Sequence, residues 1–124
     1  MATPTTATSL GESLETQAIK DYRISCATAL EPGEEIDPAH WDLTPTAEAL
    51  ALGLIHDADA TYPDPTLNTE GYAVDFWLRI DQAFAGNAAF TGAGTPLPLV
   101  LTFQTTSTPP RKDQATFYVT VVEK

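Results

Sequence analysis

Basic residues are scarce in this sequence. Its 124 residues include 6 Lys and Arg against 17 Asp and Glu, which gives a net charge of −11. Such an acidic surface repels the phosphates of nucleic acids and of anionic lipids, so the charge argues against partners of both kinds. Two interpretations of the excess stay open. The negative charge keeps the protein soluble, or it allows the protein to dock onto a basic patch of a partner.

Cysteine and histidine are almost missing as well. Cys26 is the only cysteine and therefore has no partner for an intrachain disulfide. Its apolar neighbours predict a small buried side chain rather than a catalytic thiol. His40 and His56 are the only histidines, and their spacing is not that of a zinc site. We therefore expect no metal and no cofactor.

Long apolar runs and nucleotide-binding motifs are also absent. No run approaches the roughly 18 apolar residues of a membrane span. The first residues lack the basic and apolar regions of a signal peptide, so we expect synthesis in the cytoplasm. Gly92-Ala93-Gly94 is followed by Thr95-Pro96, which fits neither a phosphate-binding loop nor a dinucleotide fingerprint. The sequence has no nucleophile-elbow motif.

Two groups of acidic residues are the nearest approach to a chemical site. The first lies in 57–64, where Pro63 breaks the spacing that a calcium loop needs. The second lies in 31–37, where paired carboxylates could hydrolyse glycosides but Pro32-Gly33 indicates a solvated turn. A hydrolase stays an alternative, and we predict that the protein is not an enzyme. The groups consist of Asp57, Asp59 and Asp64, and of Glu31, Glu34, Glu35 and Asp37.

The main feature of the sequence is a set of apolar residues that recur at every second position. This period predicts strands at 21–29, 72–81, 97–103 and 117–121, with shorter ones at 41–43 and at the end of 50–55. A turn at 31–35, a helical turn at 45–50, a loop at 57–68 and a long connection at 82–96 separate them. The predicted core comprises Tyr22, Ile24, Trp41, Leu43, Val74, Phe76, Leu78, Ile80, Leu99, Leu101, Phe103, Phe117, Val119 and Val121.

This pattern predicts one all-β domain, an antiparallel β-sandwich over residues 21–124. Residues 1–20 are expected to form an N-terminal arm. Its first nine residues have no charge and little apolar surface, so they cannot offset the entropy of ordering on their own. Residues 10–20 fit either a short helix or an extended arm that is ordered by a neighbouring subunit.

Trp77 and Arg79 share the less apolar face of the strand at 72–81. They form either a second core layer, with Arg79 paired to Asp75 or Asp81, or an interface anchor. Arg111 and Lys112 make a basic tip between the last two strands. These side chains and parts of the arm are the candidate interface residues: Thr3, Thr5, Leu10, Leu14, Trp77, Arg79, Arg111 and Lys112.

Several short motifs follow one another along the chain: Pro-Gly-Glu-x-Ile-Asp (32–37), Trp41-Asp42-Leu43, Tyr72-Ala73-Val74, Thr-Thr-Ser (105–107) and Phe-x-Val-x-Val (117–121). Their succession resembles small immunoglobulin-like virion proteins of tailed bacteriophages. The resemblance covers residues 21–124 and implies an immunoglobulin-like sandwich without catalytic activity.

The resemblance implies a structural component of the virion. Within that class we expect a capsid decoration, or cement, protein at the capsid surface. Such a protein binds the assembled shell of the major capsid protein, commonly as a homotrimer, and stabilises it. The alternative is a module of a tail or fibre that binds a host receptor or carbohydrate, with exposed aromatics such as Tyr62 or Trp77 stacked on sugars.

Overall fold

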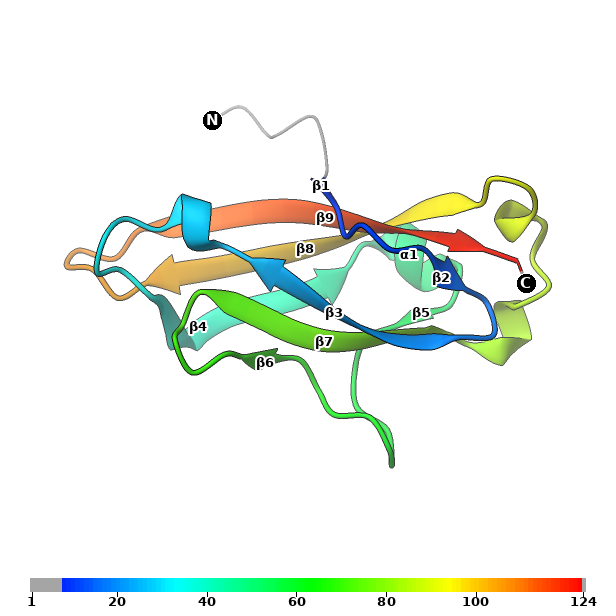
Figure 1. The fold of residues 1–124 in the computed structure, drawn as a ribbon, viewed down its shortest axis with the longest axis horizontal. Coiled ribbons are helices and arrows are strands. Elements are labelled where there is room, and N and C mark those ends of the chain that lie inside the picture. The colour runs from blue at the N-terminus through cyan, green and yellow to red at the C-terminus, as the bar shows by residue number, and fades with distance from the viewer. Residues whose placement is uncertain (1–7, 124) are drawn as a thin grey trace.

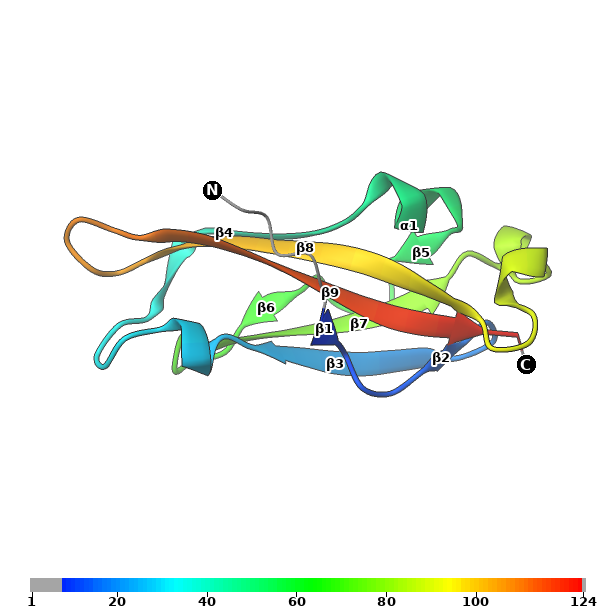
Figure 2. The same ribbon diagram turned by 90° about the horizontal axis from the view of Figure 1, so that it is seen from above.

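Two sheets face each other across a shared apolar core in the structure, a computed structural model that describes residues 8–123 (Figures 1 and 2). Within these residues the first sheet has the strand order β1-β9-β8-β4, with β2 also paired to β9. The second has the order β3-β7-β5, with β6 also paired to β7. This mostly-β architecture agrees with the all-β prediction.

The element bounds follow the expected pattern with some differences in length. The first sheet contains β1 (Thr8–Ser9), β2 (Leu14–Glu15), β4 (Ile36–Pro45), β8 (Thr95–Thr105) and β9 (Lys112–Val122). The second contains β3 (Ile19–Ser25), β5 (Leu54–Ile55), β6 (Thr66–Leu67) and β7 (Ala73–Ile80). The helical elements are α1 (Ala47–Ala51) and 3-10 turns at Ala27–Ala29, Gln82–Phe84 and Ala88–Phe90.

Strand β7 organises the second sheet because it pairs on both sides. It runs antiparallel to β3 from Ala73 to Arg79, and β5 and β6 pair with its two ends on the other side. Residues 56–65 connect β5 to β6 and leave the sheet between them (Figure 1). The outer face of β7 therefore has β3 on one flank and this loop on the other.

The core confirms most of the predicted apolar residues. Only Trp41 and Phe117 of that set lie partly buried at the margin of the core. The structure adds buried side chains that the two-residue period did not reveal, because they come from short strands, strand ends or turns: Leu14, Ile36, Leu54 and Phe90. Cys26 is buried as predicted.

The N-terminal segment differs from the predicted arm, because it pairs with a strand of its own chain. From Thr8 onward the chain lies against β9 in two short parallel pairings, Thr8 with Phe117 and Leu14 with Val121. The first sheet is therefore mixed rather than antiparallel. The boundary expected after residue 20 falls inside β3. Within residues 10–20 only β2 and the first two residues of β3 are strands, and no helix forms there. Thr3 and Thr5 lie outside the described residues.

Lys20 holds this segment at the corner between the sheets. Its ammonium group bonds to Glu12 at 3.0 Å and lies 3.3 Å from a carboxylate oxygen of Glu15. The Tyr22 hydroxyl donates to the carbonyl of Glu12 at 3.1 Å. These bonds connect β3, in one sheet, to the segment that pairs with β9, in the other.

Candidate functional site

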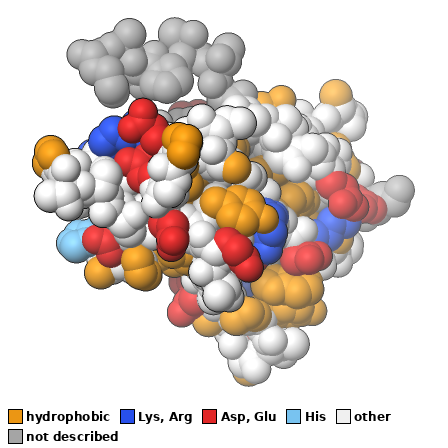
Figure 3. Space-filling model, turned by 60° about the vertical axis from the view of Figure 1, so that its left-hand side comes forward, with side chains coloured by type: hydrophobic (Ala, Val, Ile, Leu, Met, Phe, Trp, Pro, Cys, Tyr) orange, Lys and Arg blue, Asp and Glu red, His pale blue; other side chains and the backbone are white. Residues whose placement is uncertain are grey.

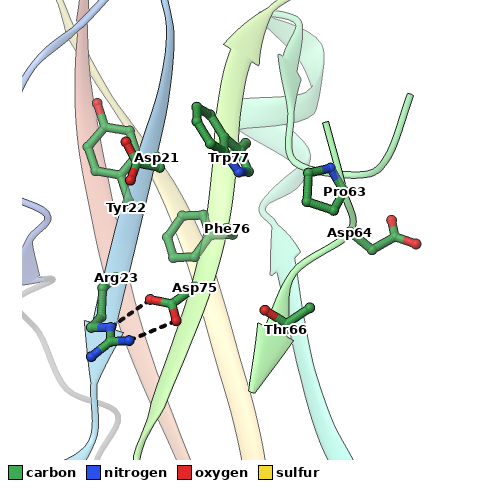
Figure 4. A pocket seen from close by; sticks show the side chains of 9 residues that line it. All are labelled: Asp21, Tyr22, Arg23, Pro63, Asp64, Thr66, Asp75, Phe76 and Trp77. Atoms are coloured by element: carbon green, nitrogen blue, oxygen red, sulfur yellow. Dashed lines mark hydrogen bonds and ion pairs between the residues drawn. The ribbon is translucent and has the colours of Figure 1, made fainter. Parts of the chain in front are cut away.

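A groove of about 540 Å³ lies on the second sheet, between β3 and the 56–65 loop. Figure 4 shows its residues on three elements: β3, the middle of β7, and the end of the loop with β6. The groove is lined by Asp21, Tyr22, Arg23, Pro63, Asp64, Thr66, Asp75, Phe76 and Trp77.

Strand alternation explains which side chains reach the groove. Tyr22 and Phe76 point into the core, where their rings stack with centroids 6.1 Å apart. Their neighbours therefore face outward, and Asp21 lies directly opposite Trp77 in the β3–β7 register. The outer face combines an aromatic ring with charged side chains on adjacent strands.

Arg23 and Asp75 form the strongest polar contact of the groove. Arg23 donates from Nε and Nη2 to the two carboxylate oxygens of Asp75, at 2.6 and 2.9 Å (Figure 4). This two-fold bond raises the pKa of the Arg23 guanidinium and lowers the pKa of the Asp75 carboxyl. The guanidinium also lies 5.9 Å from the centre of the Tyr72 ring.

Aspartates shape the loop that forms the other wall. Asp59 accepts hydrogen bonds from the backbone N–H groups of Thr61 and Tyr62, at 2.7 and 2.8 Å, and these bonds lower its pKa. Asp64 accepts from the N–H of Ala58 at 2.8 Å. Two of the three carboxylates that suggested a cation loop thus close turns within the segment.

The loop carries Tyr62 onto Trp77. Their ring centroids are 5.1 Å apart and the planes are tilted by 47°, a favourable arrangement for an aromatic pair. Trp77 is consequently half-buried rather than fully exposed. It is neither a residue of the main core nor an isolated surface aromatic.

Arg79 has a different partner from those expected. Its guanidinium reaches the loop, 3.6 Å from Asp59 and 3.2 Å from the carbonyl of Asp57, and its side chain is 16% exposed. Asp75 is engaged by Arg23 instead. The expected pairing with Asp75 or Asp81 is wrong because the loop, whose path the sequence did not show, folds back over β7.

The other candidate interface residues are not brought to this groove. Leu14 is fully buried in the core of its own chain, and Leu10 packs at the core margin, where its N–H bonds to Tyr118. The side chain of Leu14 therefore leaves no exposed surface for a neighbouring subunit to contact. Arg111 and Lys112 lie at the β8–β9 end of the molecule, and Lys112 is exposed.

The acidic turn at 31–37 is less solvated than expected. The Glu34 side chain is 4% exposed and forms an ion pair with Arg111. Asp37 lies 2.8 Å from His40 Nδ1. Within residues 8–123 no three His, Cys, Asp or Glu side chains are arranged to hold a metal ion, and no helix there is long and apolar enough to span a membrane.

The sequence pointed to only part of the groove. It singled out Trp77, and Asp64 only as part of a possible cation loop, whereas Asp21 and the Arg23–Asp75 pair were missed. The outward position of Arg23 followed from alternation, but the pairing of β3 with β7 joins segments about fifty residues apart, which local periodicity does not reveal.

On the face seen in Figure 3, Asp and Glu side chains lie among hydrophobic ones, and Lys and Arg are fewer.

Comparisons of the chain with protein-family models, with curated proteins and with solved structures found no match. The geometry therefore has to be interpreted from its own chemistry. An open groove with an aromatic ring, fixed ion pairs and additional carboxylates suits recognition of a polar or cationic group.

Proposed function

We propose that the protein is a bacteriophage capsid decoration protein with an immunoglobulin-like sandwich fold. In this role it binds the assembled shell of the major capsid protein at the capsid surface, as a homotrimer, and stabilises the shell. The motif resemblance described above supports the class of protein and the partner.

One structural observation carries the proposal of a contact role. The outer face of the second sheet keeps Trp77 half-buried in an open groove and holds Arg23 and Arg79 in ion pairs beside it. Aromatic and arginine side chains are enriched in protein–protein contacts, and a groove flanked by fixed charges provides both area and orientation.

Repetition compensates for a small contact of this kind. A shell presents many identical sites, and a trimer engages several of them at once. The second and third attachments are then effectively intramolecular, so overall binding exceeds the affinity of one groove by orders of magnitude. Modest single contacts are sufficient for a stable coat.

The test is sedimentation of the purified protein with empty shells and with disassembled capsid subunits. We expect saturable, stoichiometric binding to shells and a higher melting temperature of the decorated shells. A copy number of a few per particle, or absence from the shell, would contradict the proposal. The arm is tested by deletion of residues 1–7. Deletion of residues 1–20 is unsuitable because it removes buried Leu14 and the first residues of β3.

A carbohydrate-binding module of a tail or fibre is the second candidate, and the Tyr62–Trp77 pair at the groove favours it. Aromatic rings next to carboxylates are a common platform for sugars. A glycan array tests this function directly. Specific binding to a glycan, combined with location at the tail, would support it over the decoration role.

A further inference from the structure

The groove beside Trp77 is more acidic than its own ion pair can neutralise. Its lining carries three carboxylates, on Asp21, Asp64 and Asp75, against one guanidinium, on Arg23. Arg23 bonds to both carboxylate oxygens of Asp75. The charges of Asp21 and Asp64 are left in excess.

The nearest cations are bound elsewhere. Lys20, next to Asp21 on β3, bonds to Glu12 and lies close to Glu15. Arg79, two residues beyond Trp77, is directed at Asp59 in the loop. Asp64 accepts a hydrogen bond from a backbone N–H, which orients the carboxylate without cancelling its net charge.

The excess charge lies on both sides of the aromatic ring. Asp21 is the cross-strand partner of Trp77, and Figure 4 shows Asp21 on one side of Trp77 and, on the loop side, Pro63 with Asp64 beyond it. An indole face attracts a cation through its quadrupole, and neighbouring carboxylates add charge-assisted hydrogen bonds. The three side chains together match the ammonium or guanidinium group of a basic side chain.

We propose that this groove binds a Lys or Arg side chain presented by a basic segment of a partner protein. The alkyl stem packs against Trp77, and the charged head lies beside Asp21, with Asp64 adding negative charge from the loop side. The inference rests on the proposed function only for the identity of the partner, which is then a basic segment of the capsid shell. A neutral sugar makes no use of the excess charge, which is why the observations favour a cationic side chain.

The first experiment measures binding of a tetralysine peptide by tryptophan fluorescence. A Trp41→Phe background leaves Trp77 as the only tryptophan of the chain, which has two. We expect a saturable change in Trp77 emission that weakens as salt shortens the Debye length from about 10 Å at 0.1 M to about 3 Å at 1 M. No response to tetralysine, or an equal response to tetraglutamate, would overturn the proposal.

The second experiment removes one charge at the groove. In Asp21→Asn, tetralysine affinity should fall by up to about fivefold, the upper end of the range for an exposed ion pair. Glu48→Gln is the matched control, because Glu48 is exposed on α1 outside the groove and the net charge changes equally. Equal losses in the two variants would mean that only overall charge matters, and this would refute the site.

The third experiment separates this site from the proposed function. Asp21→Asn and Glu48→Gln are compared for binding to shells and to tetralysine. Loss of shell binding in Asp21→Asn alone supports both proposals. Unchanged shell binding with weakened peptide binding places the shell contact elsewhere and overturns the assignment of the groove's partner. Specific peptide binding without any shell binding overturns the decoration role and leaves the cation site standing.

Discussion

Arg111 and Glu34 join the tip of the β8–β9 hairpin to the connection that crosses from one sheet to the other. Arg111 Nε donates to Glu34 at 3.1 Å, and its Nη2 bonds to the second carboxylate oxygen and, at 2.9 Å, to the carbonyl of Ala29. Thr105 bonds to the backbone of Arg111 on both its N–H and its C=O. The basic tip expected to meet a partner thus has one of its two cations committed within the chain.

This pair makes the stability of the protein pH-dependent. Its bonds to Arg111 hold the pKa of the Glu34 carboxyl far below the ordinary value. The folded state therefore binds fewer protons than the unfolded state below pH about 4.3, where an unperturbed Glu titrates. The stabilisation is complete above that pH and is lost as the pH falls toward the folded-state pKa.

We predict that Glu34→Gln lowers the melting temperature at pH 7 and that its difference from wild type shrinks below pH about 4. Thermal unfolding followed by circular dichroism between pH 2 and 7 measures both effects. Glu48→Gln, which removes an exposed carboxylate on α1, should match wild type across the range. A difference for Glu34→Gln that is constant with pH would show that the pair's charge does not contribute.

Leu14 tests whether the N-terminal segment is part of the folded unit. It is fully buried and pairs with Val121 on β9. Leu14→Ala should cost about 2–5 kcal/mol in the free energy of unfolding, from lost apolar burial and the remaining cavity. Chemical denaturation provides the measurement. Leu50→Ala, at a side chain 52% exposed, should change stability by no more than about 0.5 kcal/mol.

Local pattern explains why the long strands were predictable. Tyr22, Val74, Phe76, Leu101 and similar residues alternate over enough positions to mark a buried face, and the structure buries them. The helical turn predicted at 45–50 is likewise present as α1, which Thr46 caps by accepting a hydrogen bond from the N–H of Ala49. In these regions local preference and tertiary packing agree.

Contacts between distant segments were not predictable in the same way. Leu14 lies in a two-residue strand that pairs with the distant strand β9, so no local period marks its burial. Arg79 was assigned a partner on its own strand, but the path of the 56–65 loop decides that it meets Asp59. The groove could not be predicted for the same reason, because the β3–β7 register and the path of that loop bring its side chains together.

Cys26 provides a chemical test of the core. Burial raises the pKa of its thiol to about 11, and the side chain is 4% exposed. At pH 8 the native thiolate is rarer than in an unfolded chain by about two orders of magnitude. A thiol reagent should therefore label the native protein at least about a hundredfold more slowly than the denatured protein. Equal labelling rates in the two states would show that the β3 end of the core opens readily.

Gly94 and Gly86 form a matched pair for testing the long connection between β7 and β8. Gly94 has a φ of +83°, and a Cβ added there would collide with the backbone oxygen of Val121. Backbone cannot yield like a flexible side chain, so Gly94→Ala combines an unfavourable conformation with a collision against β9. We predict a loss of more than about 1 kcal/mol in the free energy of unfolding.

Gly86→Ala is the control for Gly94→Ala in the same connection. A Cβ at Gly86 meets no atom within 4 Å, and its φ lies outside the left-handed range. Alanine there reduces the conformational entropy of the unfolded chain, so Gly86→Ala should be neutral or stabilising by up to about 1 kcal/mol. Denaturant titrations of both variants measure the contrast. Similar stabilities would mean that residues 92–95 do not pack against the end of β9, because a rigid contact with the Val121 carbonyl penalises a methyl group at Gly94 alone.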